Sequence, residues 1–286
     1  MRTIEGKRIL ITGAAAGIGR ALSESLSQQK ARLVLVDVDQ QGLADVEQTV
    51  SPQTSVECHV CDLASSTEIT KLVQTVTADE PIDILINNAG VAYYGPTEAM
   101  TQDQWDWLMA INLHAPIQLT RELLPSMLSR PEPHVVNMCS ISGIVAGGRF
   151  AAYHVSKFGL IGFTEALRAE FGRRGMGVSA ICPGPVRTDL YKSAASGREG
   201  KPVPEPPKLM TASPETIAKR TIRAIRKNKR MTLITPTAHA LYQLKRFAPG
   251  LIDLANQFSR KKFKRRRQAK QMVQQELQEH RQRRAA

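Results

Sequence analysis

The stretch Thr12-Gly-Ala-Ala-Ala-Gly-Ile-Gly19 follows a short apolar run, Arg8–Thr12, and leads into a helix-like segment, Ile18–Gln29. Its glycines permit a tight turn and let the main chain approach a ligand closely. Free N–H groups at the start of the helix attract a pyrophosphate. The stretch therefore predicts a strand, a phosphate-binding loop and a helix, with a purely structural turn as the alternative. The expected contacts are Gly13, Gly17, Ile18 and Gly19.

Short apolar runs alternate with longer amphipathic stretches from this loop to about residue 235. Strands are expected at Arg8–Thr12, Arg32–Asp37, Val56–Cys61, Ile82–Asn87, His134–Cys139, Gly177–Cys182 and Thr232–Thr235. Helices are expected at Ile18–Gln29, Thr67–Val76, Gln102–Leu128, Ala152–Gly172 and Pro214–Asn228. Several strand runs are apolar without alternation, which is typical of a parallel sheet covered on both faces. The pattern predicts a single α/β domain, a doubly wound, Rossmann-like parallel sheet in three αβα layers.

The composition sets limits on the class of protein. The chain has 286 residues, 42% of them hydrophobic and 23% charged, which is ordinary for a soluble globular protein. Four cysteines do not make a disulfide framework, so a reducing, cytoplasmic location is expected. Cys58-His-Val-Cys61 resembles half of a metal site, but positions 58 and 61 point to opposite faces of a strand. We therefore expect core packing there and no metal site.

The positive charge is unevenly distributed along the chain. The net charge is +13, and residues 260–286 hold 11 Lys and Arg against Glu276 and Glu279, a net charge of +9. The first 259 residues therefore carry 13 − 9 = +4. We divide the chain into a catalytic body, 1–235, an amphipathic extension, 236–259, and a basic tail, 260–286. Within the body, the Pro- and Gly-rich stretch 189–213 is expected to be a mobile loop over the substrate.

Asp37 ends the second predicted strand, 18 residues after Gly19. An acid at this position of a dinucleotide fold accepts hydrogen bonds from the adenosine ribose and repels the 2′-phosphate of NADP. Ala16 and Val38 supply no cation that would hold such a phosphate. These residues favour NAD, while the nearby Arg20 and Arg32 leave NADP open.

Four motifs together resemble the short-chain dehydrogenase/reductase family. They are Thr12–Gly19, Asn87-Asn-Ala-Gly90, Tyr153-x₃-Lys157 and Pro183-Gly184, in the family's order and spacing, and the likeness covers about residues 5–235. The resemblance implies further cofactor contacts on three loops. Asp62 and Leu63 would contact adenine, Asn88 and Gly90 would line the cleft, and Val186 and Thr188 would hold the nicotinamide carboxamide.

The spacing of Tyr153 and Lys157 places both side chains on one face of a helix. An ordinary tyrosine has a pKa of about 10, and a nearby ammonium favours its phenolate. Such a tyrosine can exchange a proton with an alcohol or a ketone, whereas an isolated pair would be an exposed helix feature. Lys157 and Tyr153 would also contact the cofactor. Ser140 is expected to hold the substrate oxygen, with Cys139 and Ser142 shaping the pocket, and the resemblance makes Asn112 the fourth catalytic residue, supporting a water relay to Lys157.

These motifs predict an NAD(P)-dependent oxidoreductase that transfers a hydride between nicotinamide and a secondary alcohol or ketone. An NADP-dependent carbonyl reductase is one alternative. A non-catalytic NAD-binding scaffold or membrane-tethered sensor is another. The resemblance also implies a homodimer or homotetramer formed through Gln102–Leu128 and Ala152–Gly172.

The C-terminal region leaves several interpretations open. The amphipathic stretch Ala238–Phe258 could be a lid on the substrate cleft, an oligomer contact or a helix at a membrane interface. It resembles extensions in family members that act on lipids, retinoids or steroids, which favours an apolar substrate. The run Arg260-Lys-Lys-Phe-Lys-Arg-Arg-Arg267 is either solvated or contacts anionic lipid. Binding to nucleic acid is disfavoured because Phe263 is the tail's one aromatic residue.

Overall fold

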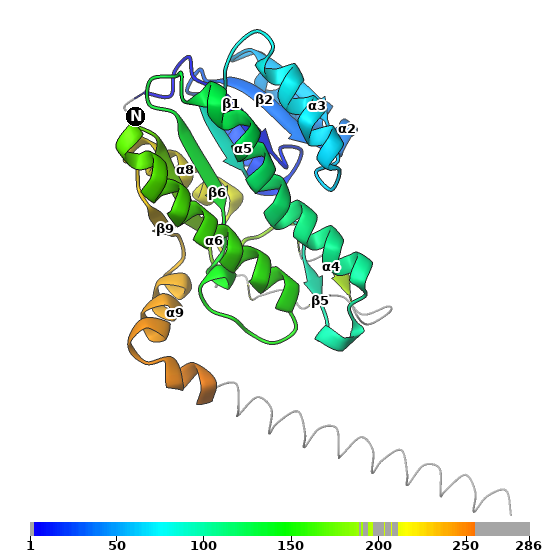
Figure 1. The fold of residues 1–286 in the computed structure, drawn as a ribbon, viewed down its shortest axis with the longest axis vertical. Helices are drawn as coiled ribbons and strands as arrows, with labels where there is room; N and C mark the ends of the chain where they lie inside the picture. The colour runs from blue at the N-terminus through cyan, green and yellow to red at the C-terminus, as the bar shows by residue number, and fades with distance from the viewer. Residues whose placement is uncertain are drawn as a thin grey trace, which may run out of the picture. The chain divides into compact units, whose positions relative to one another are not determined.

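The computed structural model describes residues 3–188, 190, 194–196, 203, 207 and 211–254. The predicted loop 189–213 lies largely outside the described residues, and the tail 260–286 lies wholly outside them. A parallel sheet with strand order β3-β2-β1-β4-β6-β7-β9 forms the centre of the fold (Figure 1). Its order reverses between β1 and β4, which opens a crevice at the carboxyl ends of these strands.

The strands of this sheet match the expected runs to within two residues. They are β1 (Arg8–Thr12), β2 (Arg32–Asp37), β3 (Val56–Val60), β4 (Ile84–Asn87), β6 (His134–Met138), β7 (Gly177–Cys182) and β9 (Met231–Leu233). The helices around it are α1 (Gly17–Ser27), α2 (Gln40–Val50), α3 (Ser66–Thr77), α4 (Gln102–Met109), α5 (Ala115–Met127), α6 (Ala151–Phe171) and α8 (Pro214–Arg226).

Alternate side chains of each central strand enter two separate apolar cores. On β1, Ile9 and Ile11 pack with Leu22 of α1 and Ile222 of α8, whereas Leu10 packs with residues of α3, α5 and α6 on the opposite face. In Figure 1, α5 and α6 cross in front of the sheet and α8 lies behind it. The predicted three-layer αβα fold with a doubly wound parallel sheet is therefore confirmed.

Three features depart from the sequence expectation. The helix α2 was not expected; it begins after Asp39, whose side chain accepts a hydrogen bond from the Gly42 N–H. The helix expected over Gln102–Leu128 is present, but it contains a π-helical turn at Ala110–His114 that joins α4 to α5. Outside the main sheet, β5 (Tyr93–Tyr94) pairs in parallel with β8 (Ala195–Ser196).

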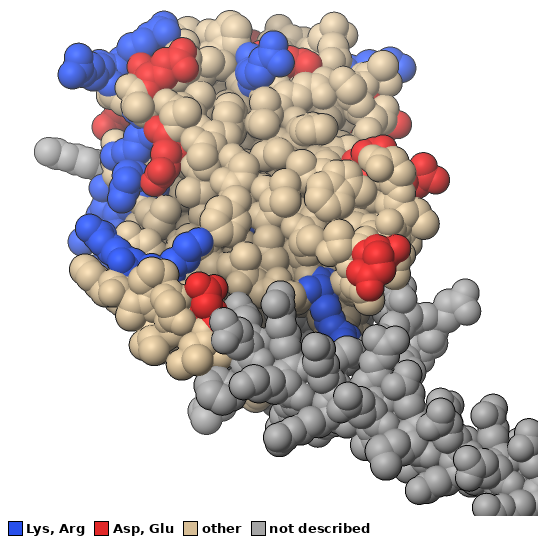
Figure 2. All heavy atoms as spheres, turned by 60° about the horizontal axis from the view of Figure 1, so that its bottom comes forward, with Lys and Arg blue, Asp and Glu red and all other residues tan. Residues whose placement is uncertain are grey.

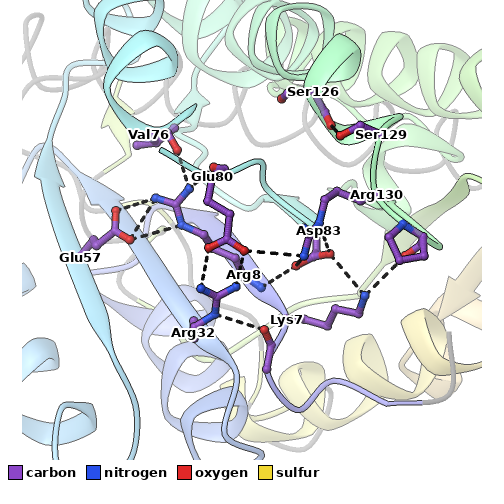
Figure 3. A network of polar contacts seen from close by, with 12 residues as sticks. Lys7, Arg8, Arg32, Glu57, Val76, Glu80, Asp83, Ser126, Ser129 and Arg130 are labelled. Atoms are coloured by element: carbon purple, nitrogen blue, oxygen red, sulfur yellow. Dashed lines mark hydrogen bonds and ion pairs between the residues drawn. The ribbon is translucent and has the colours of Figure 1, made fainter. Parts of the chain in front are cut away.

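A network of ion pairs closes the amino edge of the sheet (Figure 3). Asp83 is fully buried and accepts hydrogen bonds from the Arg130 guanidinium and from the Arg8 main-chain N–H, at 2.9 and 3.0 Å. The Arg8 side chain pairs with Glu57 at 2.7 Å, and Arg32 pairs with Glu80 at 2.6 Å. Every carboxylate of this network therefore has a cationic partner, and the site-forming polar groups lie at the other edge.

The chain divides into two compact units, residues 1–239 and 240–286. The helix α9 (Pro236–Phe247) begins in the first unit and ends in the second, and further helical turns follow at residues 249–254. In the described part of the chain, none of the helices combines the length and apolarity needed to cross a bilayer.

Candidate active site

A pocket of about 580 Å³ opens at the carboxyl ends of the central strands. Thirteen of the predicted site residues line it, namely Gly13, Gly17, Ile18, Asp37, Asp62, Leu63, Asn88, Gly90, Ser140, Tyr153, Lys157, Val186 and Thr188. Gly19 and Asn112 are not part of the lining and lie behind it. The predicted residues come from the ends of six strands or the segments that follow them, and from helix α6, and the fold brings them to one cavity.

The glycine loop between β1 and α1 forms a cradle that a side chain would fill. Gly13 has φ of +66°, and a Cβ on it would lie 2.8 Å from the main chain of Ala89. A Cβ on Gly19 would overlap the carbonyl of Gly13. Gly19 therefore acts from behind the pocket: its missing side chain allows α1 to start directly under the loop.

The N-terminus of α1 lacks the side-chain cap found on several other helices. The helices α2, α3, α4 and α8 each have a side-chain cap, formed by a hydrogen bond to Asp39, Ser65, Thr101 and Ser213, respectively. The N-cap of α1 is Ala16, which has no such bond, and no acid lies in its first turn. Because these N–H groups face the pocket uncapped, they fit an anionic pyrophosphate.

A hydrogen-bonded tie joins the glycine loop to the loop after β4. The Asn88 side-chain amide donates to the carbonyls of Thr12 and Gly13, both at 3.0 Å. In return, the Thr12 hydroxyl accepts from the main-chain N–H groups of Asn88 and Ala89. Asn88 therefore fixes the wall of the cleft, and Thr12 is a supporting residue that the glycine spacing alone does not identify.

Asp37 projects from the end of β2 into the same pocket. Its carboxylate accepts hydrogen bonds from three main-chain N–H groups, those of Ala15, Val38 and Asp39, at 2.8 to 3.1 Å. These bonds fix the carboxylate beside the glycine loop. Among the described residues that line the pocket, Lys157 is the one Lys or Arg.

The two cations near Asp37 in the sequence are engaged elsewhere. Arg20 pairs with Glu24 at 2.9 Å, one turn further along α1. Arg32 lies at the start of β2 and pairs with Glu80 at the amino edge. Neither residue lines the pocket. The described lining of the pocket therefore includes two acids, Asp37 and Asp62, and no arginine.

Lys157 is a buried ammonium on α6, with 3% of its surface exposed. Its Nζ donates to the Met138 carbonyl at 2.9 Å and lies 5.7 Å from the centroid of the Tyr153 ring. Burial lowers the pKa of Lys157, and the thiols of Cys139 and Cys182 act in the opposite direction. Burial and a hydrogen bond with Cys139 raise the pKa of the Cys182 thiol. The ammonium thus lies beside Tyr153 with a main-chain oxygen as its partner.

An aromatic ring, that of Phe150, contacts Tyr153 in the pocket lining. The ring of Phe150, which precedes α6, meets Tyr153 edge-on at 6.2 Å between centroids and lies 5.0 Å from the ring of Tyr94. Edge contacts of this kind are favourable and restrict ring orientation. Phe150 lines the pocket, and no sequence motif pointed to it.

Ser140 immediately follows Cys139 at the end of β6 and is nine-tenths buried. Its Oγ accepts a hydrogen bond from the Ser142 N–H at 3.1 Å, and no acceptor for its own O–H is found among the described residues. His154 supports this loop from α6: its Nδ1 is 2.8 Å from the Ser142 carbonyl, and its Nε2 accepts from the Gly147 N–H. Sequence reasoning gave His154 no role, and its contacts are structural.

Asn112 lies in the π-helical turn and is fully buried behind the pocket. Its side chain is occupied: Oδ1 accepts from the Val91 N–H and Nδ2 donates to the Val91 carbonyl, both at 2.8 Å. Pro116, four residues later, has no N–H, so the main-chain carbonyl of Asn112 loses its α-helical donor. The side chain therefore anchors the loop after β4 to the π-helical turn.

The segment after β7 forms another wall of the pocket. Val186 is buried, and its main chain pairs with Ala212 in a short parallel bridge. The Thr188 side chain lies against Gly17, whose hypothetical Cβ would be 3.1 Å from the Thr188 methyl. The glycine loop and this segment therefore face each other across the cleft.

The Cys58/Cys61 pair has the packing expected of core residues. Cys58 packs on the core of α1 and α2, and Cys61 on the opposite core. Burial raises the pKa of each thiol to about 11. No group of three or more potential metal ligands occurs among the described residues.

Comparison with known proteins gives the family. A model of the short chain dehydrogenase family matches residues 7–199. A D-threitol dehydrogenase of Mycolicibacterium smegmatis is 35% identical over 199 residues, covering 69% of this chain and 76% of that protein. A short-chain dehydrogenase/reductase of Burkholderia phymatum, solved with NAD, superposes with a TM-score of 0.77 at 25% identity, covering 88% and 96% of the two chains.

A metagenomic short-chain oxidoreductase, solved with NADP, superposes with a TM-score of 0.68 at 31% identity, covering 81% of this chain and 97% of that one. The glycine cradle, the uncapped α1 and the buried Lys157 fit the nicotinamide dinucleotides of these neighbours. The chain belongs to the short-chain dehydrogenase/reductase family and is an NAD(P)-dependent oxidoreductase of CH–OH groups.

Proposed function

We propose that the protein interconverts a secondary alcohol and the corresponding ketone, with Tyr153 as acid/base. The observation that carries this proposal is the buried Lys157 ammonium, 5.7 Å from the Tyr153 ring centroid and paired with a main-chain carbonyl. A cation at this distance favours the phenolate over the phenol. When bound, the nicotinamide supplies the hydride acceptor or donor of the reaction. Tyr153 takes the alcohol proton in one direction and returns it in the other.

Ser140 and Asn112 support this proton transfer in different ways. The Ser140 hydroxyl, fixed by the Ser142 N–H, donates to the substrate oxygen and holds it near Tyr153. Asn112 positions the loop after β4 through Val91, and its main-chain carbonyl holds the water that connects to Lys157. The Asn112 side chain therefore has a positioning role, because both of its polar atoms are already engaged.

We propose NAD as the preferred cofactor over NADP. In this proposal the pyrophosphate is held by the glycine loop, through Gly13, Gly17, Ile18 and Gly19. The ribose is held by Asp37, and the adenine by Asp62 and Leu63. The cleft is lined by Asn88 and Gly90, and the carboxamide is held by Val186 and Thr188. Asp37 and the ion pairs that divert Arg20 and Arg32 support the preference. A 2′-phosphate would meet a carboxylate and no arginine among the described lining residues.

We propose an apolar substrate. The substrate side of the pocket is lined by Val91, Ala92, Ile111, Ile141, Phe150 and Leu190. Such a surface gives a polyol, the substrate in the name of the D-threitol dehydrogenase relative, few partners for its hydroxyls. The end of the body that carries α4 and β5 comes forward in Figure 2 and has few charges near its centre.

We propose a homodimer or homotetramer in the cytoplasm. Trp107 of α4 and Val155 and Phe158 of α6 are large apolar side chains that stay exposed on neighbouring helices. Burial of such side chains against a second copy would stabilise the assembly. The four cysteines are free thiols, as expected in a reducing compartment.

The test is Tyr153→Phe, measured for activity and for dinucleotide affinity. A panel of apolar secondary alcohols and ketones should give turnover with NAD or NADH, and the variant should lose about 10³-fold or more in kcat. Its affinity for NAD should remain within a few-fold, because the phenyl ring stays in place. Full biological function in the variant would instead favour a binding scaffold. Faster turnover with NADPH than with NADH would favour a carbonyl reductase.

A further inference from the structure

The helix α9 and the turns that follow carry apolar side chains that remain in solvent. Leu241, Phe247, Leu251 and Leu254 are exposed, and Phe247 is 76% exposed. Together with the partly buried Leu244, they recur every three or four residues. Leu241, Leu244 and Phe247 therefore lie along one side of α9. Leu251 and Leu254 follow on the helical turns 249–254, after a break at Ala248. We call these five residues the α9 stripe.

Cations accompany the α9 stripe. Lys245 and Arg246 are exposed on the same helix, and the Arg246 guanidinium lies 5.6 Å from the centroid of the Phe247 ring. Asp253 is the one acid between residues 236 and 254. The sequence then adds Arg260-Lys-Lys-Phe-Lys-Arg-Arg-Arg267, which starts six residues after Leu254. Apolar and cationic residues are therefore adjacent along the chain.

We propose that this C-terminal region docks on the surface of an anionic membrane. The α9 stripe would enter the boundary between headgroups and acyl chains, and the cations of residues 245–267 would contact anionic headgroups. A few exposed apolar side chains, or a basic run alone, give weak and reversible membrane binding, and the combination is much stronger. This inference is independent of the proposed function, since it concerns a different unit of the chain.

Other occupants fit the same surface less well. A second copy of the chain would place one strongly basic region close to another, which like charges oppose. A nucleic acid would attract the cations, but its phosphates would not bury the apolar side chains of Phe247, Leu251 and Leu254. The remaining exposed large apolar residues, such as Val60 and Val155, have no cationic run beside them in the sequence. An anionic bilayer uses both features at once.

The test is co-sedimentation of the full-length protein with vesicles. Vesicles of phosphatidylcholine with about 30% phosphatidylserine should bind the protein at least about tenfold more tightly than phosphatidylcholine alone. This binding should weaken as ionic strength rises above the physiological range. Because sedimentation needs no cofactor or turnover, the result is distinguishable from any failure of the proposed function.

Two variants separate the apolar and cationic contributions. The double variant Phe247→Ser and Leu251→Ser should lower vesicle binding about tenfold or more. Neutralising Lys261, Lys262 and Lys264 to Gln should lower it by on the order of 100-fold, about fivefold for each cation. Val60→Ser, a matched change at an exposed position outside the C-terminal region, should leave binding unchanged.

Four results would overturn the proposal. The first is no sedimentation with phosphatidylserine vesicles. The second is vesicle binding that the serine double variant leaves unchanged. The third is a double variant that converts a dimer into a monomer without weakening vesicle binding, which would assign the surface to a second copy. The fourth is tighter binding to a single-stranded oligonucleotide than to the vesicles, which would assign the cations to nucleic acid.

Discussion

At the amino edge of the central sheet, Asp83 is buried among Lys7, Arg8 and Arg130, and its carboxylate is paired on both oxygens. At the carboxyl edge, Lys157 is also buried, and its hydrogen-bond partner among the described residues is one main-chain carbonyl, that of Met138. The first arrangement satisfies its charges within the protein (Figure 3). The second keeps a charge beside a pocket where a ligand can use it. Stability is therefore expected to depend on one edge and activity on the other.

The largest expected effect is the loss of activity in Lys157→Met. Without the ammonium, the phenolate of Tyr153 is no longer favoured, and kcat/KM should fall on the order of 10³-fold or more. Because the change removes a buried charge and keeps an apolar chain of similar length, the free energy of unfolding should not fall. Steady-state kinetics and thermal melting on the same preparation test both statements. A variant that keeps activity would contradict the role of Lys157.

The next largest effect is a loss of stability, with activity retained, when Asp83 at the amino edge is changed. Burial alone would raise the pKa of Asp83, but hydrogen bonds from Arg130 and from the Arg8 N–H outweigh it and lower the pKa. Asp83→Asn removes the negative charge that Lys7 and Arg130 share, and leaves Arg130 with the more distant Glu80, 3.7 Å away. The free energy of unfolding should fall by about 3 kcal/mol, with kcat at 25 °C nearly unchanged. Denaturant titration measures the free energy of unfolding, and steady-state kinetics measures kcat. A large loss of kcat beside the loss of stability would contradict the division of roles between the two edges.

A pH dependence of stability should come from His134, at the start of β6. Burial lowers the pKa of His134 to about 3. Its unfolded pKa is about 6.5, so the unfolded chain binds a proton that the folded chain does not. The free energy of unfolding should therefore decrease as the pH falls, by about 2 kcal/mol between pH 6.5 and pH 5. The lowered pKa values of Asp83 and Glu80 add a further loss only at more acidic pH.

The control for this dependence is His134→Gln, which keeps a polar group near Ser179. Urea titrations of both proteins at several pH values give the comparison. The variant should be less stable at neutral pH but nearly independent of pH between 6.5 and 5. An equal slope in both proteins would assign the titration to another group.

The smallest effect concerns the choice of cofactor. Asp37→Ser removes the carboxylate that would accept the ribose hydroxyls and repel a 2′-phosphate. Affinity for NAD should fall about tenfold and affinity for NADP should rise, a change of about 1–2 kcal/mol in each case. Fluorescence titration with both dinucleotides measures the ratio. Asp39→Ser, a change of an acid two residues away, is the matched control and should leave the NAD to NADP ratio unchanged.

The sequence predicts the sheet well because each strand is a short apolar run and its two faces are covered by helices. It predicts the motif residues because Gly13, Tyr153 and Lys157 occur at fixed spacings. It does not predict contacts that arise only when distant loops meet. Phe150 against Tyr153, Thr12 against Asn88 and the two Asn112–Val91 bonds are of this kind.

The π-helical turn inside the predicted helix Gln102–Leu128 has a local cause that the sequence shows. Pro116 removes the N–H that the Asn112 carbonyl would receive in an α-helix. Proline near the start of a helix is common, however, so Pro116 does not by itself distinguish a π-helical turn from a regular helix. The Asn112 side chain decides the outcome, because it pairs with Val91, a partner 21 residues away.

The most direct measurement is calorimetric titration of the full-length protein with NAD, beside the variant Gly19→Val. We expect saturable heat at a single site in the unmodified chain. We expect none in the variant, because a side chain at Gly19 would overlap the Gly13 carbonyl and deform the cradle. The melting curve of the variant in the absence of NAD separates lost binding from lost folding. Absence of NAD and NADP binding in the unmodified protein would contradict the assignment of this pocket.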